Sequence, residues 1–169
     1  MGTIIKLLTC GVAAAGIMAS APVMAATATG NSEAVLLRPL SIVNTDDLDF
    51  GTLLRGATAG TVVIDPFTDA RSTTGGVTAA GGAPLAARFV TYGGPLQTLQ
   101  VNRGPLPVLT RIGGGATMNV TQLTLNGPTL RFLSAAGIVD LRVGGTMNVA
   151  ANQLEGTYTG TFTIIVTYF

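Results

Sequence analysis

An acidic cluster is the densest group of chemically active side chains in this chain, and it comprises Asp46, Asp47 and Asp49. Carboxylates this close together could offer several oxygen ligands to Ca²⁺. The segment lacks the other ligands of a calcium-binding loop, because Thr58 stands where a bidentate Glu would be needed. The alternative is structural, with Asn44 and Asp46 capping a turn. Leu48 and Phe50 then point inward as the next strand begins, and we expect no metal site.

Catalysis needs groups that exchange protons near neutral pH, or nucleophiles that can be activated. The chain has no His, and its single Lys and single Cys, Lys6 and Cys10, lie in an N-terminal segment that we expect to be removed. Paired carboxylates could act on a glycoside, but the sequence has no Trp and no aromatic-rich stretch to hold a sugar. We therefore expect a protein that is not an enzyme, with no catalytic residues and no cofactor.

The first 25 residues have the three regions of a secretory signal peptide. Lys6 supplies the positive charge, residues 7–18 form an apolar run, and residues 23–25 fit a cleavage site before Ala26. A membrane anchor is the weaker alternative, because Pro22 ends a run shorter than the roughly 20 apolar residues that a spanning helix needs. We expect residues 1–25 to be cleaved during export, leaving a mature chain without a membrane span.

The composition of the remaining chain excludes some partners. Removal of Lys6 lowers the formal charge from +1 to zero. A neutral chain has no electrostatic attraction for nucleic acid or for an anionic membrane. Charged residues make up 10% of the full sequence, which predicts an unusually apolar exterior, part of which becomes covered by other molecules. With no cysteine after residue 25, the mature chain must be held together by packing or by association.

Short β-type segments separated by turn residues recur along the mature chain. The predicted strands are 36–43, 48–54, 61–64, 76–78, 87–92, 97–101, 108–112, 116–125, 130–132, 138–143, 146–149 and 158–168. Glycine clusters such as 113–115 and 144–145 are read as turns between them. Strands that recur about every 8–12 residues predict an all-β fold, an antiparallel sandwich or barrel.

Residues 158–168 show the strictest alternation in the chain. Threonines occupy one face, whereas the other face carries Tyr158, Phe162, Ile164, Val166 and Tyr168. Because strand side chains alternate with period two, this pattern predicts a half-buried strand. No further strand follows it, so one of its edges must pair with an earlier strand, with another chain or with water.

This segment resembles the C-terminal strand of bacterial chaperone–usher pilus subunits, with Gly156 thirteen positions before the last residue and Tyr168 penultimate. Residues 39–51, 143–153 and 156–162 resemble a family of secreted bacterial proteins filed as domain of unknown function 4402. Together the likeness covers nearly all of the mature chain. The pilus resemblance implies an immunoglobulin-like antiparallel β-sandwich that lacks its last strand and is completed by strand donation.

In pilus subunits, a periplasmic chaperone first fills the groove beside the C-terminal strand, and the N-terminal extension of another subunit then replaces it. The resemblance implies that the assembly strand uses Gly156, Phe162, Ile164, Val166 and Tyr168, and Tyr158 shares their face. The candidate donor arm is residues 26–38, whose large apolar residues are Val35, Leu36 and Leu37. The sandwich domain would be residues 39–169. The arm could donate to another copy, fold back in cis or have no partner, and the residues leave these alternatives open.

The sequence therefore leads to two hypotheses. In the first, the chain is an exported structural subunit of a bacterial surface fibre or pilus, of the kind used in cell adhesion. It would assemble with copies of itself or related subunits by β-strand complementation, aided by a periplasmic chaperone and an usher. Its location would be the periplasm in transit and then the cell surface. In the second hypothesis, it is a self-complete secreted β-sandwich that binds a carbohydrate, a protein or an envelope component.

Overall fold

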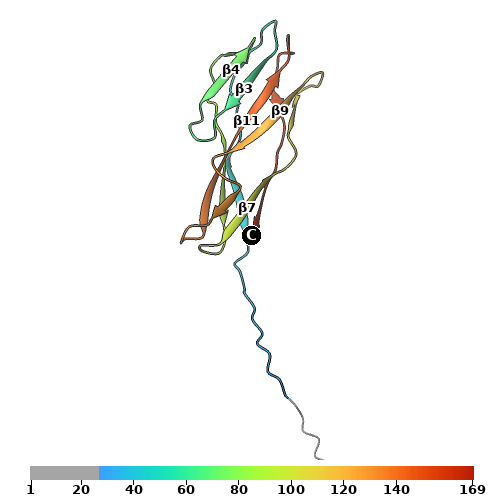
Figure 1. The fold of residues 1–169 in the computed structure, drawn as a ribbon. Coiled ribbons are helices and arrows are strands. Elements are labelled where there is room, and N and C mark those ends of the chain that lie inside the picture. The colour runs from blue at the N-terminus through green and yellow to red at the C-terminus, as the bar shows by residue number, and fades with distance from the viewer. Residues whose placement is uncertain (1–26) are drawn as a thin grey trace, which may run out of the picture. The chain divides into compact units, whose positions relative to one another are not determined.

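The computed structural model describes residues 27–169, which form thirteen strands and no helix (Figure 1). Every strand pair is antiparallel. The predicted all-β, antiparallel class is therefore confirmed, and the arrangement is sandwich-like. The expected signal peptide, residues 1–25, lies outside the described residues. No helix in residues 27–169 has the length and apolar character needed to cross a membrane.

The larger sheet has eight strands. Six follow the order β1, β6, β11, β9, β8, β12, and β3 and β4 extend the sheet from β11. Their bounds are β1 Ser41–Asp46, β3 Gly60–Ile64, β4 Arg71–Gly75, β6 Ala87–Tyr92, β8 Val108–Arg111, β9 Thr117–Leu125, β11 Ile138–Val149 and β12 Tyr158–Thr159. The sheet thus begins with the first strand of the chain and ends with the next-to-last one.

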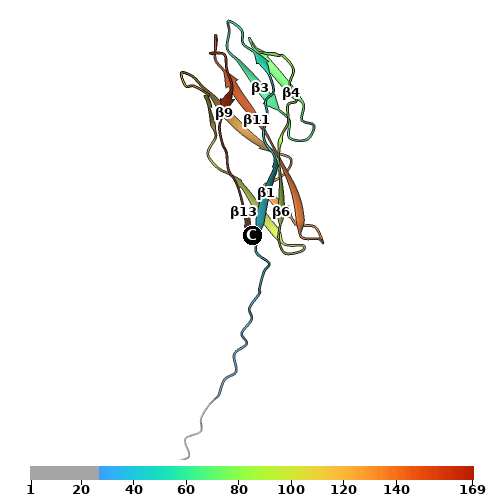
Figure 2. The same ribbon diagram turned by 180° about the vertical axis from the view of Figure 1, so that it is seen from behind.

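Two smaller sheets complete the fold. The first has the order β10 (Leu130–Phe132), β7 (Thr98–Arg103), β13 (Ile164–Tyr168), and the second pairs β2 (Leu53–Leu54) with β5 (Thr78–Ala79). Figure 2 shows β1, β6 and β13 from behind. Val101 of β7 and Ile164 of β13 belong to the same apolar core as side chains of the larger sheet. The larger sheet contributes Leu123, Leu141 and Met147, among others. Burial of this apolar surface is the main force that holds the sheets together.

Strand β11 corrects one prediction from the sequence. Gly144 and Gly145 were expected to form a turn, but both lie inside a single twelve-residue strand. The first half of β11 pairs with β6 and the second half with β3 on the same edge. Gly144 sits where the partner changes, and a Cβ atom there would lie 2.1 Å from the Ile64 carbonyl oxygen. The glycine therefore permits a close approach between strands instead of a chain reversal.

The acidic segment also differs from its expected turn. Asn44 and Asp46 lie within β1 and face β6, with a register shift between them. The turn that does occur uses Asp49, whose carboxylate accepts a hydrogen bond from the Gly51 N–H at 2.7 Å. Gly51 has a positive φ of 68°, which glycine adopts without strain. The inward orientation expected of Phe50 is confirmed, because its side chain is buried.

Residues 27–40 have no regular secondary structure. The compact unit that contains all the strands begins at Leu36 and continues to Phe169. The candidate donor arm thus lies partly outside this unit and contributes nothing to its sheets.

Candidate functional site

The predicted C-terminal strand is two strands in the structure. β12 pairs with β8 in the larger sheet, whereas β13 pairs with β7 in the three-stranded sheet. The chain changes sheets at residues 160–163, so the prediction of one continuous strand is wrong. At Gly160 a Cβ atom would lie 2.8 Å from the Val108 carbonyl oxygen, which explains why a small residue is needed there.

The predicted alternation is nevertheless correct across the break. Ile164 is buried, and the other inward side chains are half-buried, namely Tyr158, Phe162, Val166 and Tyr168. The threonines between them are exposed. Phe162 packs edge-to-face on Phe89 of β6, with ring centroids 6.0 Å apart. The alternating face therefore contributes to the core without being fully covered.

One edge of β13 has no partner strand. The Gly104 N–H donates to the Thr163 carbonyl at 2.8 Å, and the Phe169 N–H donates to the Thr98 carbonyl at 3.1 Å. In an antiparallel ladder, residues bonded in this way alternate with residues whose N–H and C=O groups point the opposite way. The even-numbered residues of β13 therefore direct these groups to the other edge, where no strand within residues 27–169 pairs.

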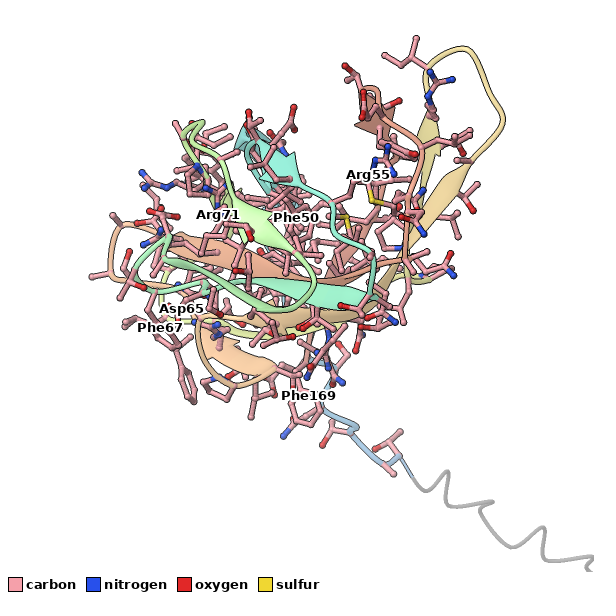
Figure 3. The ribbon with its side chains drawn as sticks, turned by 90° about the horizontal axis from the view of Figure 1, so that it is seen from above. Phe50, Arg55, Asp65, Phe67, Arg71 and Phe169 are labelled. Carbon is pink, nitrogen blue, oxygen red and sulfur yellow. The ribbon has the colours of Figure 1, made fainter. Side chains whose placement is uncertain are left out.

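A groove of about 780 Å³ lies beside the segment that leads into β12. Residues 48–55 form one wall and residues 153–158 form the other. Its floor is apolar and comprises Leu109, Met118, Met147 and Val149. Figure 3 views the molecule from above, with Phe50 and Arg55 of the first wall labelled. Half-buried apolar side chains from both walls pack against the core, among them Leu48, Leu53 and Tyr158.

Polar contacts join the two walls at one end of the groove. Arg55 forms an ion pair with Glu155, with 3.2 Å between the nitrogen and oxygen. The Asn152 N–H donates to the Gly56 carbonyl at 3.1 Å. Both charged side chains of the ion pair are solvent-exposed, so the pair contributes less than about 1 kcal/mol. These contacts link the two walls and the residues next to them.

Gly156, carried over from the pilus motif, has a structural role here. Its φ is +141°, and a Cβ atom would lie 2.7 Å from Nε of Arg111. That same Nε donates to the Glu155 carbonyl at 2.5 Å. A side chain at position 156 would therefore strain the backbone and displace the guanidinium that fixes the wall.

Tyr158 anchors the same wall. Its hydroxyl donates to the Leu154 carbonyl at 2.6 Å and accepts a hydrogen bond from Nε2 of Gln153 at 2.9 Å. Gln153 is buried and also donates to the Thr117 carbonyl at 3.1 Å. A buried amide with both partners in place holds its surroundings rigid. Sequence reasoning missed Gln153, because a single Gln in a loop carries no pattern.

Tyr168 ties the far end of β13 to the segment that precedes the first strand. Its hydroxyl donates to the Arg38 carbonyl at 2.6 Å and accepts from the Gly94 N–H at 2.7 Å. The penultimate tyrosine therefore marks the point where the N-terminal segment joins the folded unit. Of the candidate donor residues, Leu36 is 98% exposed, Leu37 is 38% exposed and Val35 is 76% exposed.

The acidic and basic residues elsewhere act as structural links. Asp69 forms ion pairs with Arg88 and Arg142 and accepts a hydrogen bond from the Ala86 N–H. Burial raises the pKa of Asp69, but the hydrogen bonds from Arg142 and Ala86 outweigh it, and the pKa lies below its ordinary value. The N–H groups of Phe67 and Thr68 lower the pKa of Asp65 in the same turn. In residues 27–169, no three acidic, His or Cys side chains gather in a way that could hold a metal ion.

The structure therefore defines an all-β protein with a β-strand open along one edge and a separate apolar groove beside the segment that leads into β12. The chain belongs to the family described as Domain of unknown function (DUF4402), whose model matches residues 40–168. This confirms the family expected from the sequence. A search of the curated proteins found no match to the chain, and a search of the solved structures found none.

Proposed function

We propose that the chain is an exported structural subunit that assembles into a bacterial surface fibre by accepting a strand from another copy or a related subunit. The free edge of β13 is the observation that carries this proposal. Its outward-pointing N–H and C=O groups offer a row of hydrogen bonds to an added strand, and its inward side chains remain half-covered. An unpaired edge that carries Ile and Val is an aggregation hazard unless another chain covers it.

The N-terminal arm is the proposed donor. Leu36 is almost fully exposed, so its apolar surface is available to another molecule. An arm that adds to β13 of a second copy would bury Leu36 and complete the second copy's core. The proposal includes export through the signal peptide, passage through the periplasm with a chaperone and usher as partners, and a final location at the cell surface.

The test uses a chain that begins at residue 39 and a synthetic peptide of residues 26–38. We expect the truncated chain to remain monomeric and to bind the peptide, with slowed hydrogen exchange at the N–H groups of Ile164, Val166 and Tyr168. A peptide with Leu36→Asp is the matched control and should bind at least ten-fold more weakly. If the truncated chain assembles as the longer chain does, or if neither peptide protects β13, the proposal fails.

A second candidate function is supported by a neighbouring groove, which shares Met118, Val149 and Gln153 with the first. A groove of about 540 Å³ between β3, β4, β9 and β11 is lined by uncharged polar side chains, among them Thr61, Thr74, Asn119 and Asn148. The Thr61 and Thr74 hydroxyls are hydrogen-bonded at 2.6 Å. Hydroxyls and amides without charge suit a neutral carbohydrate, as in the binding-module hypothesis. A monomer that binds neutral oligosaccharides, and loses that binding with Asn119→Ala and Asn148→Ala, would favour this function.

A further inference from the structure

We propose that two apolar ends of the folded unit bind each other between successive copies, so that fibre contacts extend beyond the donated strand. This inference rests on the proposed strand donation. The "root end" is the set Leu36, Leu96, Phe132 and Phe169, and the "mouth end" is the set Leu54, Ile112 and Leu154. The exposed fractions of these seven side chains range from 53% to 98%.

Hydrogen bonds and strand register bring the two root-end phenylalanines together, and the Leu96 N–H donates to the carbonyl of Ser134, two residues after Phe132. Phe132 pairs in register with Thr98, and the Phe169 N–H donates to the Thr98 carbonyl on its other side. Two exposed phenylalanines therefore flank one residue of β7. Tyr168, next to Phe169, holds the Arg38 carbonyl, which brings the start of the arm to the same end.

The mouth-end side chains lie at or next to the groove, since Leu54 and Leu154 line it and Ile112 bonds to the lining residue Thr157. The Ile112 N–H donates to the Thr157 carbonyl at 2.8 Å. Leu154 lies across from the adjacent turn, with its Cδ1 atom 3.7 Å from the Cβ position of Gly115. Leu54 precedes Arg55, which pairs with Glu155. Figure 1 shows the C-terminus at the end of the folded unit opposite the upper loops of β3, β4 and β9.

The short distance along the chain from Leu36 to Arg38 indicates that the mouth end is occupied by the root end of a second copy of the chain. Arg38 is fixed to the body of its own subunit, and Leu36 is two residues away, a reach of at most about 7 Å. A Leu36 side chain seated in the groove of another copy therefore draws its own root end onto that copy's mouth end. Both surfaces are apolar, so the contact adds hydrophobic burial to the hydrogen bonds of the added strand.

The contact joins a root end to a mouth end. A pair of subunits therefore still has one free root end and one free mouth end. Head-to-tail contacts of this type produce open filaments when the rotation between copies does not close a ring. Identical surfaces meeting across a two-fold axis would instead stop at a dimer. The two arrangements can be separated by mixing variants.

The experiment uses the chain from residue 26 with the arm intact. The root-end variant is Phe132→Asp with Phe169→Asp, and the mouth-end variant is Ile112→Asp with Leu154→Asp. Phe67→Asp is the matched control, since Phe67 is 61% exposed but lies in the turn between β3 and β4. Circular dichroism and thermal unfolding should be unchanged in all three, because the replaced side chains lie on the surface.

We expect each double variant to raise the concentration needed for assembly at least ten-fold in sedimentation velocity, and the control to leave it unchanged. An equimolar mixture of the two variants should form heterodimers and stop, because one intact root end and one intact mouth end remain to meet. Fibres from either variant at the wild-type concentration would overturn the proposal, as would homodimers of each variant alone. If the proposed strand donation itself is wrong, the result is different, because assembly then does not require residues 26–38.

Discussion

Strands β11 and β13 have the same alternating pattern but different surroundings. β11 pairs on both edges, with β6 and β3 on one side and β9 on the other, and its inward residues Leu141, Val143 and Met147 are at most 1% exposed. β13 pairs on one edge, and along it Ile164 alone is buried, while Val166 stays half-buried. Side-chain alternation therefore determines which face turns inward, whereas the neighbouring strands determine how far that face is covered.

The largest expected effect comes from charge on the inward faces. Leu141→Asp and Ile164→Asp should each prevent folded protein from accumulating, because an unpaired carboxylate in the core costs several kcal/mol. Phe162→Asp should behave similarly. Thr163→Asp is the control on the outward face and should be much milder. Soluble yield and circular dichroism measure the difference, and equal damage from positions 163 and 164 would show that the register is wrong.

A pair of proline substitutions tests the open edge directly. Thr167→Pro should destabilise the fold by about 3 kcal/mol, because the N–H of residue 167 faces β7 in the ladder. Val166→Pro removes an N–H on the open side and should cost about 1–2 kcal/mol, mainly through lost packing. In the middle of β11, which pairs on both edges, proline should be equally damaging at odd-numbered and even-numbered positions. Urea denaturation gives these values, and a larger loss for Val166→Pro would mean that a strand already covers that edge.

Removing one hydroxyl tests the attachment of β13 at its far end. Tyr168→Phe should lower the free energy of unfolding by about 1–2 kcal/mol, since the hydroxyl bonds both Arg38 and Gly94. Hydrogen exchange at the Gly94 N–H should accelerate more than exchange within β11. Unchanged exchange at Gly94 would contradict this role of the tyrosine.

The smallest expected effect is on the stability of the fold at low pH, through Asp69 and its contact with β11. Asp69 binds Arg142 of β11, and its pKa lies below the ordinary value, so it binds a proton less readily when folded. Its stabilising contribution is complete above about pH 4 and is lost as the pH falls through the folded pKa. Asp69→Asn keeps the size of the side chain and tolerates the positive φ of 61° at this position. The variant should show a shallower loss of stability below about pH 4 in thermal unfolding, and an unchanged slope would exclude Asp69 as a source of acid sensitivity.

Local pattern was sufficient for the all-β class, most strand positions and the inward face of the C-terminal segment. The strand at 87–92 was predicted with its observed bounds, and so was the strand at 130–132. Several bounds were wrong, since residues 36–40 have no regular structure, the strand predicted at 48–54 is reduced to Leu53–Leu54, and β4 was not predicted. Glycine caused a further error. Gly144 and Gly145 have the composition of a turn, yet they serve a close approach inside β11, which depends on Ile64 some eighty residues earlier.

Most of the candidate site could not be predicted, because its contacts join residues distant in sequence. The ion pair between Arg55 and Glu155 spans 100 positions, and the hydrogen bond from Tyr168 to Arg38 spans 130. Neither pair has a local signal that would identify its partner.

The sequence by itself determined the family, the absence of His, and the alternation of Tyr158, Phe162, Ile164, Val166 and Tyr168. Alternation is a property of the extended backbone, so it can be read without knowledge of neighbours. The tertiary structure alone decided that β12 and β13 belong to different sheets and that β13 is unpaired on one edge within residues 27–169. Strand pairing is set by hydrogen bonds between distant segments, and a free edge is known only once every other described strand has been placed.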